Sequence, residues 1–195
     1  MALNSLNYLN LVELFKTIAI KLNNRPNDEE RSKTFARIGI DIFICLKWFI
    51  IIMLWSKAIT NFFWTILIWY LIIANVYSYF YNHIWTDEAL NTENFTKDRI
   101  RSRFLNLMLA VAYSTFCFGY FYQVVYPFDF YWAEHSPSFY LAIQYSFSNS
   151  LAANFEQIKP VSDIANQISN LQLAITFIFV TIILSKSIPQ TNSIT

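Results

Sequence analysis

Glycine, cysteine and charge are all scarce in this sequence. Of its 195 residues, two are glycine, two are cysteine and 14% are charged, with a formal net charge of +1. So small a net charge provides no field that would attract nucleic acid. Cys45 and Cys117 form no CxxC pair and lie in apolar runs, so we expect small buried hydrophobic residues. The sequence contains no nucleotide-binding motif, nucleophile–base pair or metal-ligand cluster, so we expect neither a cofactor nor an enzymatic activity.

Apolar residues, by contrast, are abundant and collected into long runs. They make up 55% of the chain, and the charged residues lie mainly between the runs. An apolar run of about 18 residues or more is typical of a transmembrane helix. The sequence therefore predicts an all-α membrane protein with four transmembrane helices, at residues 38–59, 60–79, 104–126 and 167–188.

The N-terminal segment has a different pattern. Five apolar residues recur there at helical spacing: Leu11, Leu14, Phe15, Ile18 and Leu22. Glu13 and Lys16 interrupt the apolar residues, so no secretory signal is expected. The spacing predicts an amphipathic helix, which lies in the membrane interface or packs on another part of the protein. A polar turn is expected after it, at residues 23–32.

Two ionisable residues, Asp41 and Lys47, lie within the first predicted span. Because they are six residues apart, they do not share a helix face and are not expected to pair within the helix. Asp41 is expected near the interface. Lys47 is expected to reach the interface by snorkelling, and a buried partner is the alternative.

Basic residues indicate the orientation of the spans. The N-terminal segment holds Lys16, Lys21, Arg25, Arg31, Lys33 and Arg37, and the connection between the second and third spans holds Lys97, Arg99, Arg101 and Arg103. On the opposite side there are only Lys57 and Lys159. Since Lys and Arg mark the cytoplasmic side, we expect both termini in the cytoplasm and a multi-pass protein of the plasma (inner) membrane.

This orientation predicts five regions. Residues 1–37 form an amphipathic cytoplasmic segment, 38–81 a first transmembrane hairpin and 82–103 a cytoplasmic loop. Residues 104–188 form a second membrane module, and 189–195 a short cytoplasmic tail. Within the second module, residues 127–166 lie outside, and their aromatic residues are expected to form an interfacial belt: Phe128, Phe130, Tyr131 and Trp132.

The second module contains a helix-length segment, 138–153, between its two spans. A short irregular stretch with Glu156 and Pro160 follows it. Irregular backbone at membrane depth is tolerated only where protein buries it or where it lines a water-filled cavity. We therefore predict a re-entrant helix between the third and fourth spans, entering and leaving from the outer face.

Three segments of this module resemble the pore domain of potassium-channel-like proteins. Residues 142–151, AIQYSFSNSL, are similar to the pore helix, and residues 158–161, IKPV, are similar to the segment after the selectivity filter. Residues 170–186 resemble the inner helix, and the third span would be the outer helix. The resemblance covers about half the chain and implies a homotetrameric pore, to which the first two spans are additional.

The filter departs from that family. Aligned on the proline of IKPV, five residues stand where a potassium channel has T-V-G-Y-G: Ala152, Ala153, Asn154, Phe155 and Glu156. No glycine follows Gly119, and glycine permits the backbone angles that align the filter carbonyls. We therefore expect no potassium selectivity of the usual kind.

Side chains are expected to replace the carbonyls. Four Glu156 carboxylates would surround the axis, and rings of acidic residues suit cation pathways. Asn149, Ser150 and Asn154 are candidate neutral ligands behind them. The alternative is that Glu156 is an ordinary exposed acid on an outer loop.

The fourth span has a polar face of its own. Gln172, Thr176 and Val180 recur at i and i+4, so they are the predicted pore lining, and polar contact between packed helices is the alternative. The function we expect is a cation-conducting pore with weak or altered selectivity. Its expected partners are membrane lipids, further copies of the chain, permeating cations and an unidentified gating partner. Two alternatives remain open: a non-conducting membrane scaffold or signalling protein, with its axis plugged by Phe155 or Phe179, and a membrane-depolarising effector.

Overall fold

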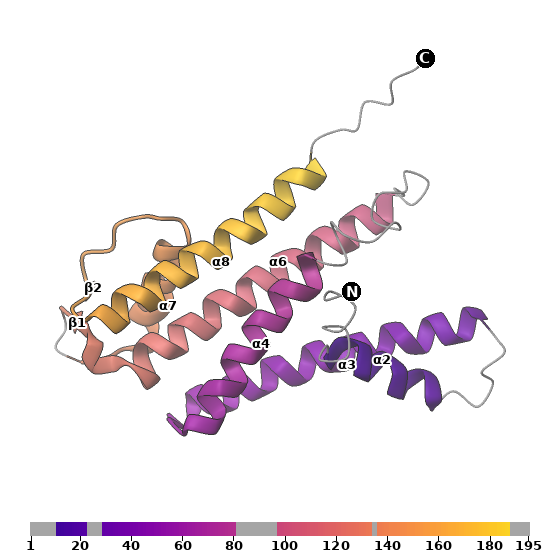
Figure 1. The fold of residues 1–195 in the computed structure, drawn as a ribbon, viewed down its shortest axis with the longest axis horizontal. Coiled ribbons are helices and arrows are strands. Elements are labelled where there is room, and N and C mark those ends of the chain that lie inside the picture. The colour runs from indigo at the N-terminus through magenta and orange to yellow at the C-terminus, as the bar shows by residue number, and fades with distance from the viewer. Residues whose placement is uncertain (1–10, 23–28, 81–96, 134–135, 188–195) are drawn as a thin grey trace, which may run out of the picture. The chain divides into compact units, whose positions relative to one another are not determined.

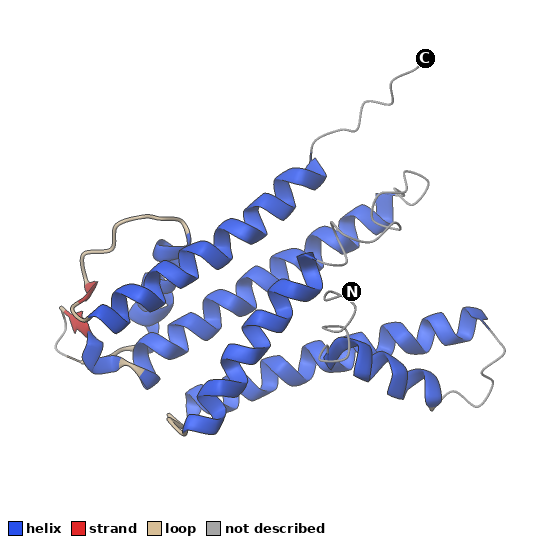
Figure 2. Cartoon of the chain, in the orientation of Figure 1, coloured by secondary structure: helices blue, strands red, loops and turns tan. Residues whose placement is uncertain are grey.

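The computed structural model describes residues 11–22, 29–80, 97–133 and 136–187. It is mostly helical (Figure 1, Figure 2). Four helices are long and apolar enough to cross a membrane, over Glu30–Ser56, Phe62–Phe80, Phe104–Val125 and Asp163–Ile182. The predicted set of four apolar, membrane-length helices is therefore confirmed. Most of the predicted loop 82–103 and the whole tail 189–195 lie outside the described residues.

The chain divides into two compact units, residues 1–57 and 58–195. The division falls inside the predicted hairpin 38–81, so each of its helices belongs to a different unit.

The first unit is a pair of helices, α2 (Leu11–Lys21) and α3 (Glu29–Ser56). They approach closely at Gly39, where an added Cβ would lie 2.8 Å from the Phe15 carbonyl oxygen and 2.9 Å from the Ala19 Cβ. Next to this contact the rings of Phe15 and Phe43 lie 5.3 Å apart. Of the two expectations for the N-terminal helix, the structure shows packing on another part of the protein, although Leu14 and Ile18 stay exposed.

Helix α3 begins earlier than its apolar run. It includes residues 29–37, so the turn predicted at 23–32 is wrong over its last four residues, which are helical. Charged residues such as Glu, Arg and Lys are good helix formers, and this explains the extension. Asp41 is exposed, whereas Lys47 is only 6% exposed. Lys47 is therefore buried within the protein, which favours the alternative of a buried partner over snorkelling.

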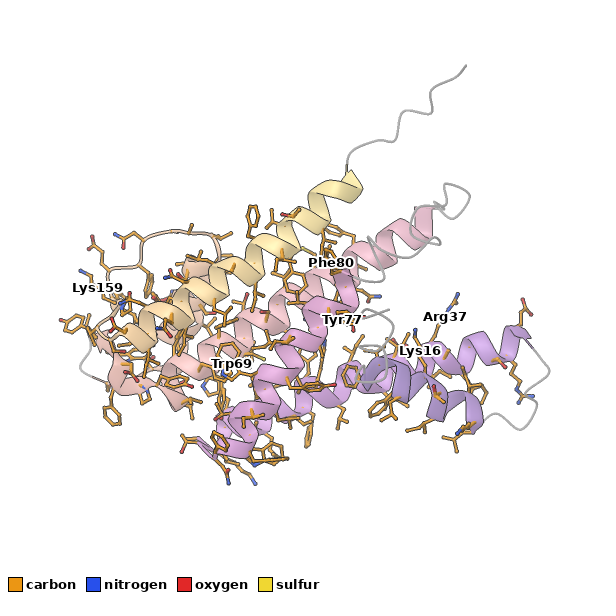
Figure 3. The ribbon with its side chains drawn as sticks, viewed as in Figure 1. Lys16, Arg37, Trp69, Tyr77, Phe80 and Lys159 are labelled. Atoms are coloured by element: carbon orange, nitrogen blue, oxygen red, sulfur yellow. The ribbon has the colours of Figure 1, made fainter. Side chains whose placement is uncertain are left out.

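Three long helices form the frame of the second unit: α4 (Phe62–Phe80), α6 (Lys97–Tyr120) and α8 (Asp163–Ser187). Helix α4 packs on both of the others. Its buried Asn75 donates a hydrogen bond from Nδ2 to the Ala110 carbonyl oxygen of α6 at 3.1 Å. Trp69 of α4, labelled in Figure 3, stacks on Phe121 with ring centroids 4.5 Å apart. These two contacts hold α4 against α6 and the turn that follows it.

The end of α6 changes direction through a π-helical turn, η4 (Phe121–Val125), and a 3₁₀ turn, η5 (Pro127–Asp129). Strand β1 (Phe130–Trp132) then pairs antiparallel with β2 (Ile158–Pro160), with Tyr131 opposite Lys159. Successive side chains of a strand point to opposite sides. Phe130 and Trp132 are therefore buried, and the aromatic belt predicted for them is wrong, whereas Tyr131 is exposed and Phe128 is 96% exposed.

Candidate functional site: the short helix α7 and the loop that follows it

A short helix, α7 (Phe139–Ser150), lies between η4 and α8 in the second unit. Its 12 residues correspond to about 18 Å, which is less than the hydrocarbon thickness of about 30 Å. It therefore does not cross a bilayer as the four longer helices can. Ser138 caps its start by accepting a hydrogen bond at Oγ from the Leu141 N–H at 3.5 Å. The helix ends three residues before the predicted boundary at 153.

The C-terminus of α7 is closed by a Schellman motif. The Ala152 N–H donates to the Asn149 carbonyl at 2.9 Å, and the Ala153 N–H donates to the Ser148 carbonyl at 2.8 Å. Ala152 has φ of +53°, a left-handed conformation usually taken by glycine at this position. An L-residue with a Cβ pays about 1–2 kcal/mol for it. The first residue of the predicted filter thus serves as the cap of the helix.

The loop that follows is open to its surroundings. Ala152, Ala153, Asn154 and Glu156 are exposed, and Phe155 is half-buried with its ring 6.4 Å from that of Tyr145. The far end of the loop is held by the strand pair, where the Ala133 N–H donates to the Gln157 carbonyl at 2.9 Å. The five predicted filter residues therefore form one exposed loop that is fixed at both ends. Exposure of Glu156 fits both a carboxylate ring and a simple surface acid.

Gln172 of α8 is the centre of a buried hydrogen-bond network beneath this loop. It is 1% exposed. Its Nε2 donates to the Ser146 carbonyl at 2.8 Å and to the Ser146 Oγ at 2.7 Å. Its Oε1 accepts from the Tyr122 hydroxyl at 2.5 Å and from Asn149 Nδ2 at 2.8 Å. Both donors and both acceptor positions of the amide are thus satisfied.

Further hydrogen bonds connect this network to α6 and add contacts between α7 and α8. The Ser146 hydroxyl donates to the Thr115 carbonyl of α6 at 2.7 Å, and Asn149 Nδ2 donates to the Ser169 carbonyl of α8 at 3.0 Å. The Tyr145 hydroxyl lies 3.1 Å from the Ser169 Oγ. Hydrogen bonds between membrane helices contribute about 0.6 kcal/mol each on average, and up to about 1.7.

The network changes the role of two predicted ligands. Asn149 and Ser150 were expected as neutral groups behind Glu156. Asn149 instead donates its amide hydrogens to α8 and η4, and the Ser150 hydroxyl donates to the Phe147 carbonyl of its own helix at 2.7 Å. Only Asn154 of the three stays in the exposed loop with Glu156.

The predicted pore lining on α8 is not one exposed face. Gln172 is buried, Thr176 is half-buried and Val180 is exposed. The i, i+4 spacing places the three residues on one side of α8. At Gln172 that side is buried, because the side chain forms hydrogen bonds with α7. Gln172 thus makes the polar contact between packed helices that was the alternative to a pore-lining role.

Several members of the network were missed in the sequence, among them Tyr122, Ser146 and Ser169. A signal was present, because polar residues recur at i and i+3 on two adjacent segments: Ser146 with Asn149, and Ser169 with Gln172. Such pairs on one helix face indicate a polar contact between helices.

Comparison of the chain with protein-family models, with curated proteins and with solved structures gives no match. Among the described residues, no group of three or more His, Cys, Asp or Glu is placed to hold a metal ion.

Proposed function

We propose that this chain is the pore-forming subunit of a cation channel in which α7 is a re-entrant pore helix. The observation that carries the proposal is the position of α7. A helix too short to span a bilayer is clamped between two membrane-length helices by uncharged hydrogen bonds, and it leads into an exposed loop. Four copies around one axis are proposed from the likeness to potassium-channel pore domains.

The physical chemistry of α7 suits a place inside a membrane. Its polar side chains Ser146 and Asn149 are paired with neighbouring helices, and its terminal carbonyls are used in the Schellman motif. Polar groups without partners are costly in hydrocarbon. The loop at residues 152–157 has few internal hydrogen bonds, so at membrane depth it needs water or other copies of the chain around it.

The loop favours weak or altered selectivity. Its first residue, Ala152, has its left-handed conformation committed to the helix cap, and the loop has no glycine to align carbonyls along an axis. Glu156 is exposed on it. A ring of Glu156 carboxylates would attract cations over anions, with Asn154 as a neutral neighbour. We also propose the plasma membrane location with cytoplasmic termini, on the distribution of Lys and Arg.

Cation uptake by vesicles tests the proposal. The purified chain is reconstituted in lipid vesicles that enclose a cation-sensitive dye, and a gradient of a monovalent cation is applied. The proposal predicts uptake well above that of empty vesicles. No uptake at any membrane potential or lipid composition would overturn it.

A non-conducting membrane scaffold is the second candidate. It is favoured by the packing of Phe155 beside Tyr145 and by the tethering of the loop at both ends. Of its two candidate plugs, Phe179 is 0% exposed within the subunit and 6.2 Å from the Tyr79 ring, which leaves Phe155. An oligomer structure with Phe155 closing the axis would support this candidate. A depolarising effector would share the conducting structure and differ in its effect on the cell.

A further inference from the structure

On the exposed side of α8, the residues along the centre line have polar or small side chains. Five exposed residues form this polar stripe: Asp163, Gln167, Asn170, Ala174 and Thr181. At about 100° per residue they fall within about 60° of one another around the helix. Phe177, which is 72% exposed, lies at one margin, and the exposed apolar residues Ile164, Leu171 and Ile178 lie at the other. Gln172 points to the opposite side of the helix, toward α7.

The stripe does not suit contact with lipid. Asn170 lies about 10 Å along the helix axis from Asp163, which places it within an apolar span. Within the described residues, the side chains of Asn170 and Gln167 make no hydrogen bond. An amide side chain without a hydrogen-bond partner is costly in hydrocarbon, so these two positions suit contact with protein or with water.

The exposed sides of two other helices, α3 and α4, differ from the stripe in composition. The exposed large side chains of α3 and α4 include Ile38, Ile42, Phe49, Ile52, Phe62, Phe63, Ile66 and Ile73. Apart from occasional polar residues, these sides are apolar and suited to hydrocarbon. The polar stripe of α8 differs because polar or small residues follow each other at intervals of three or four from Asp163 to Ala174.

We propose that the polar stripe lines a water-filled passage between copies of this chain. The inference rests on the proposed pore and names its inner wall as Gln167, Asn170, Ala174 and Thr181, in place of Gln172. The stripe runs about 27 Å from Asp163 to Thr181, close to the hydrocarbon thickness. A dry helix contact needs one or two polar pairs, whereas the stripe has four polar or small residues in succession from Asp163 to Ala174 and a fifth, Thr181, seven residues further on. Asp163 adds a carboxylate at the outer end, where it would attract cations.

Thiol accessibility tests this inference on the full chain in lipid vesicles. The background variant is Cys45→Ala, which removes the exposed cysteine and keeps the buried Cys117 as a measure of background labelling. Asn170→Cys and Ala174→Cys probe the stripe. Leu171→Cys is the matched control, because it is exposed at nearly the same depth outside the stripe. The reagent is a membrane-impermeant cationic methanethiosulfonate.

The inference predicts labelling at Asn170→Cys and Ala174→Cys that is at least about tenfold faster than at Leu171→Cys, because only a hydrated thiol ionises to the reactive thiolate. Equal rates at the three positions would overturn it. Disulfide cross-links between copies at Asn170→Cys without labelling would also overturn it, since they indicate dry packing. Ala174→Cys gives an independent answer if Asn170→Cys fails to fold.

Cation uptake by the same vesicles separates this inference from the proposed function. Labelling of the stripe without cation uptake would support the water-lined passage and overturn conduction. Cation uptake with no labelling of the stripe would support conduction and overturn the water-lined passage along α8.

Discussion

Gln172 of α8 donates both of its side-chain N–H groups to Ser146 of α7, at 2.8 Å to the carbonyl oxygen and 2.7 Å to Oγ. The same amide accepts hydrogen bonds from Tyr122 and Asn149. One uncharged side chain therefore connects the helix before α7, α7 itself and the helix after it. This arrangement holds the exposed loop at residues 152–157 in a defined place without a buried charge.

Replacement of Gln172 by leucine removes this connection. Gln172→Leu leaves the Ser146 carbonyl, the Asn149 amide and the Tyr122 hydroxyl short of partners, so we expect a loss of about 1–3 kcal/mol in the free energy of unfolding. Thr181→Val is the matched control, because the Thr181 hydroxyl donates within its own helix, to the Phe177 carbonyl. Denaturant titration in detergent micelles measures both. A loss for Gln172→Leu no greater than that for Thr181→Val would contradict the role given to the network.

The left-handed conformation of Ala152 predicts a substitution that raises the free energy of unfolding. Ala152→Gly removes the cost of a left-handed conformation in a residue with a Cβ. The greater entropy of glycine in the unfolded chain offsets part of this gain, so we expect a net stabilisation of the second unit by about 0.5–1 kcal/mol. Ala153→Gly, one residue on and without a positive φ, should be neutral or destabilising. The same denaturant titration compares the two variants. Destabilisation by Ala152→Gly would show that residue 152 does not hold this conformation.

Hydropathy accounts for the part of the fold that could be predicted. The second span was expected at 60–79 and the helix runs over Phe62–Phe80, because an uninterrupted apolar run gives clear limits. The first span was expected from residue 38, yet α3 begins at Glu29. A hydropathy pattern ends where charge begins, whereas a helix of good helix formers continues.

The site was predicted only in outline. The sequence indicates a short helix before residues 152–156, and the structure has that helix. It does not indicate how each helix is rotated, since i, i+4 spacing groups Gln172 with Thr176 without telling which side faces α7. That choice depends on Ser146 and Tyr122, whose positions follow from tertiary packing. The burial of Phe130 and Trp132 likewise depends on a strand pairing between residues about 28 positions apart, in the register that joins Phe130 to Pro160 and Trp132 to Ile158.

The close approach of α2 and α3 predicts the effect of a single added methyl group. Gly39→Ala would place a Cβ 2.8 Å from the Phe15 carbonyl oxygen, and because a backbone atom cannot rotate away, α2 must shift from α3. We expect a cost of about 1–3 kcal/mol to this packing. Trypsin cleavage within α2, at Lys16 or Lys21, should then become several-fold faster. Cys45→Val enlarges an exposed position on the same helix and should leave the rate unchanged. Equal cleavage of Gly39→Ala and the parent protein would argue against the contact.

The reversal potential of the reconstituted protein under a salt gradient tests the central claim most directly. If the loop after α7 lies on a cation pathway, the reversal potential of the parent protein is displaced from zero toward the equilibrium potential of the cation. Glu156→Gln moves the reversal potential back toward zero, because a ring of carboxylates is lost. Lys159→Gln is the matched control, since Lys159 is also exposed and lies three residues away on β2. Lys159→Gln should leave the reversal potential unchanged or move it further toward the equilibrium potential of the cation. Current with the same reversal potential in the parent protein and Glu156→Gln would remove Glu156 from the pathway, and absence of any current would contradict the pore itself.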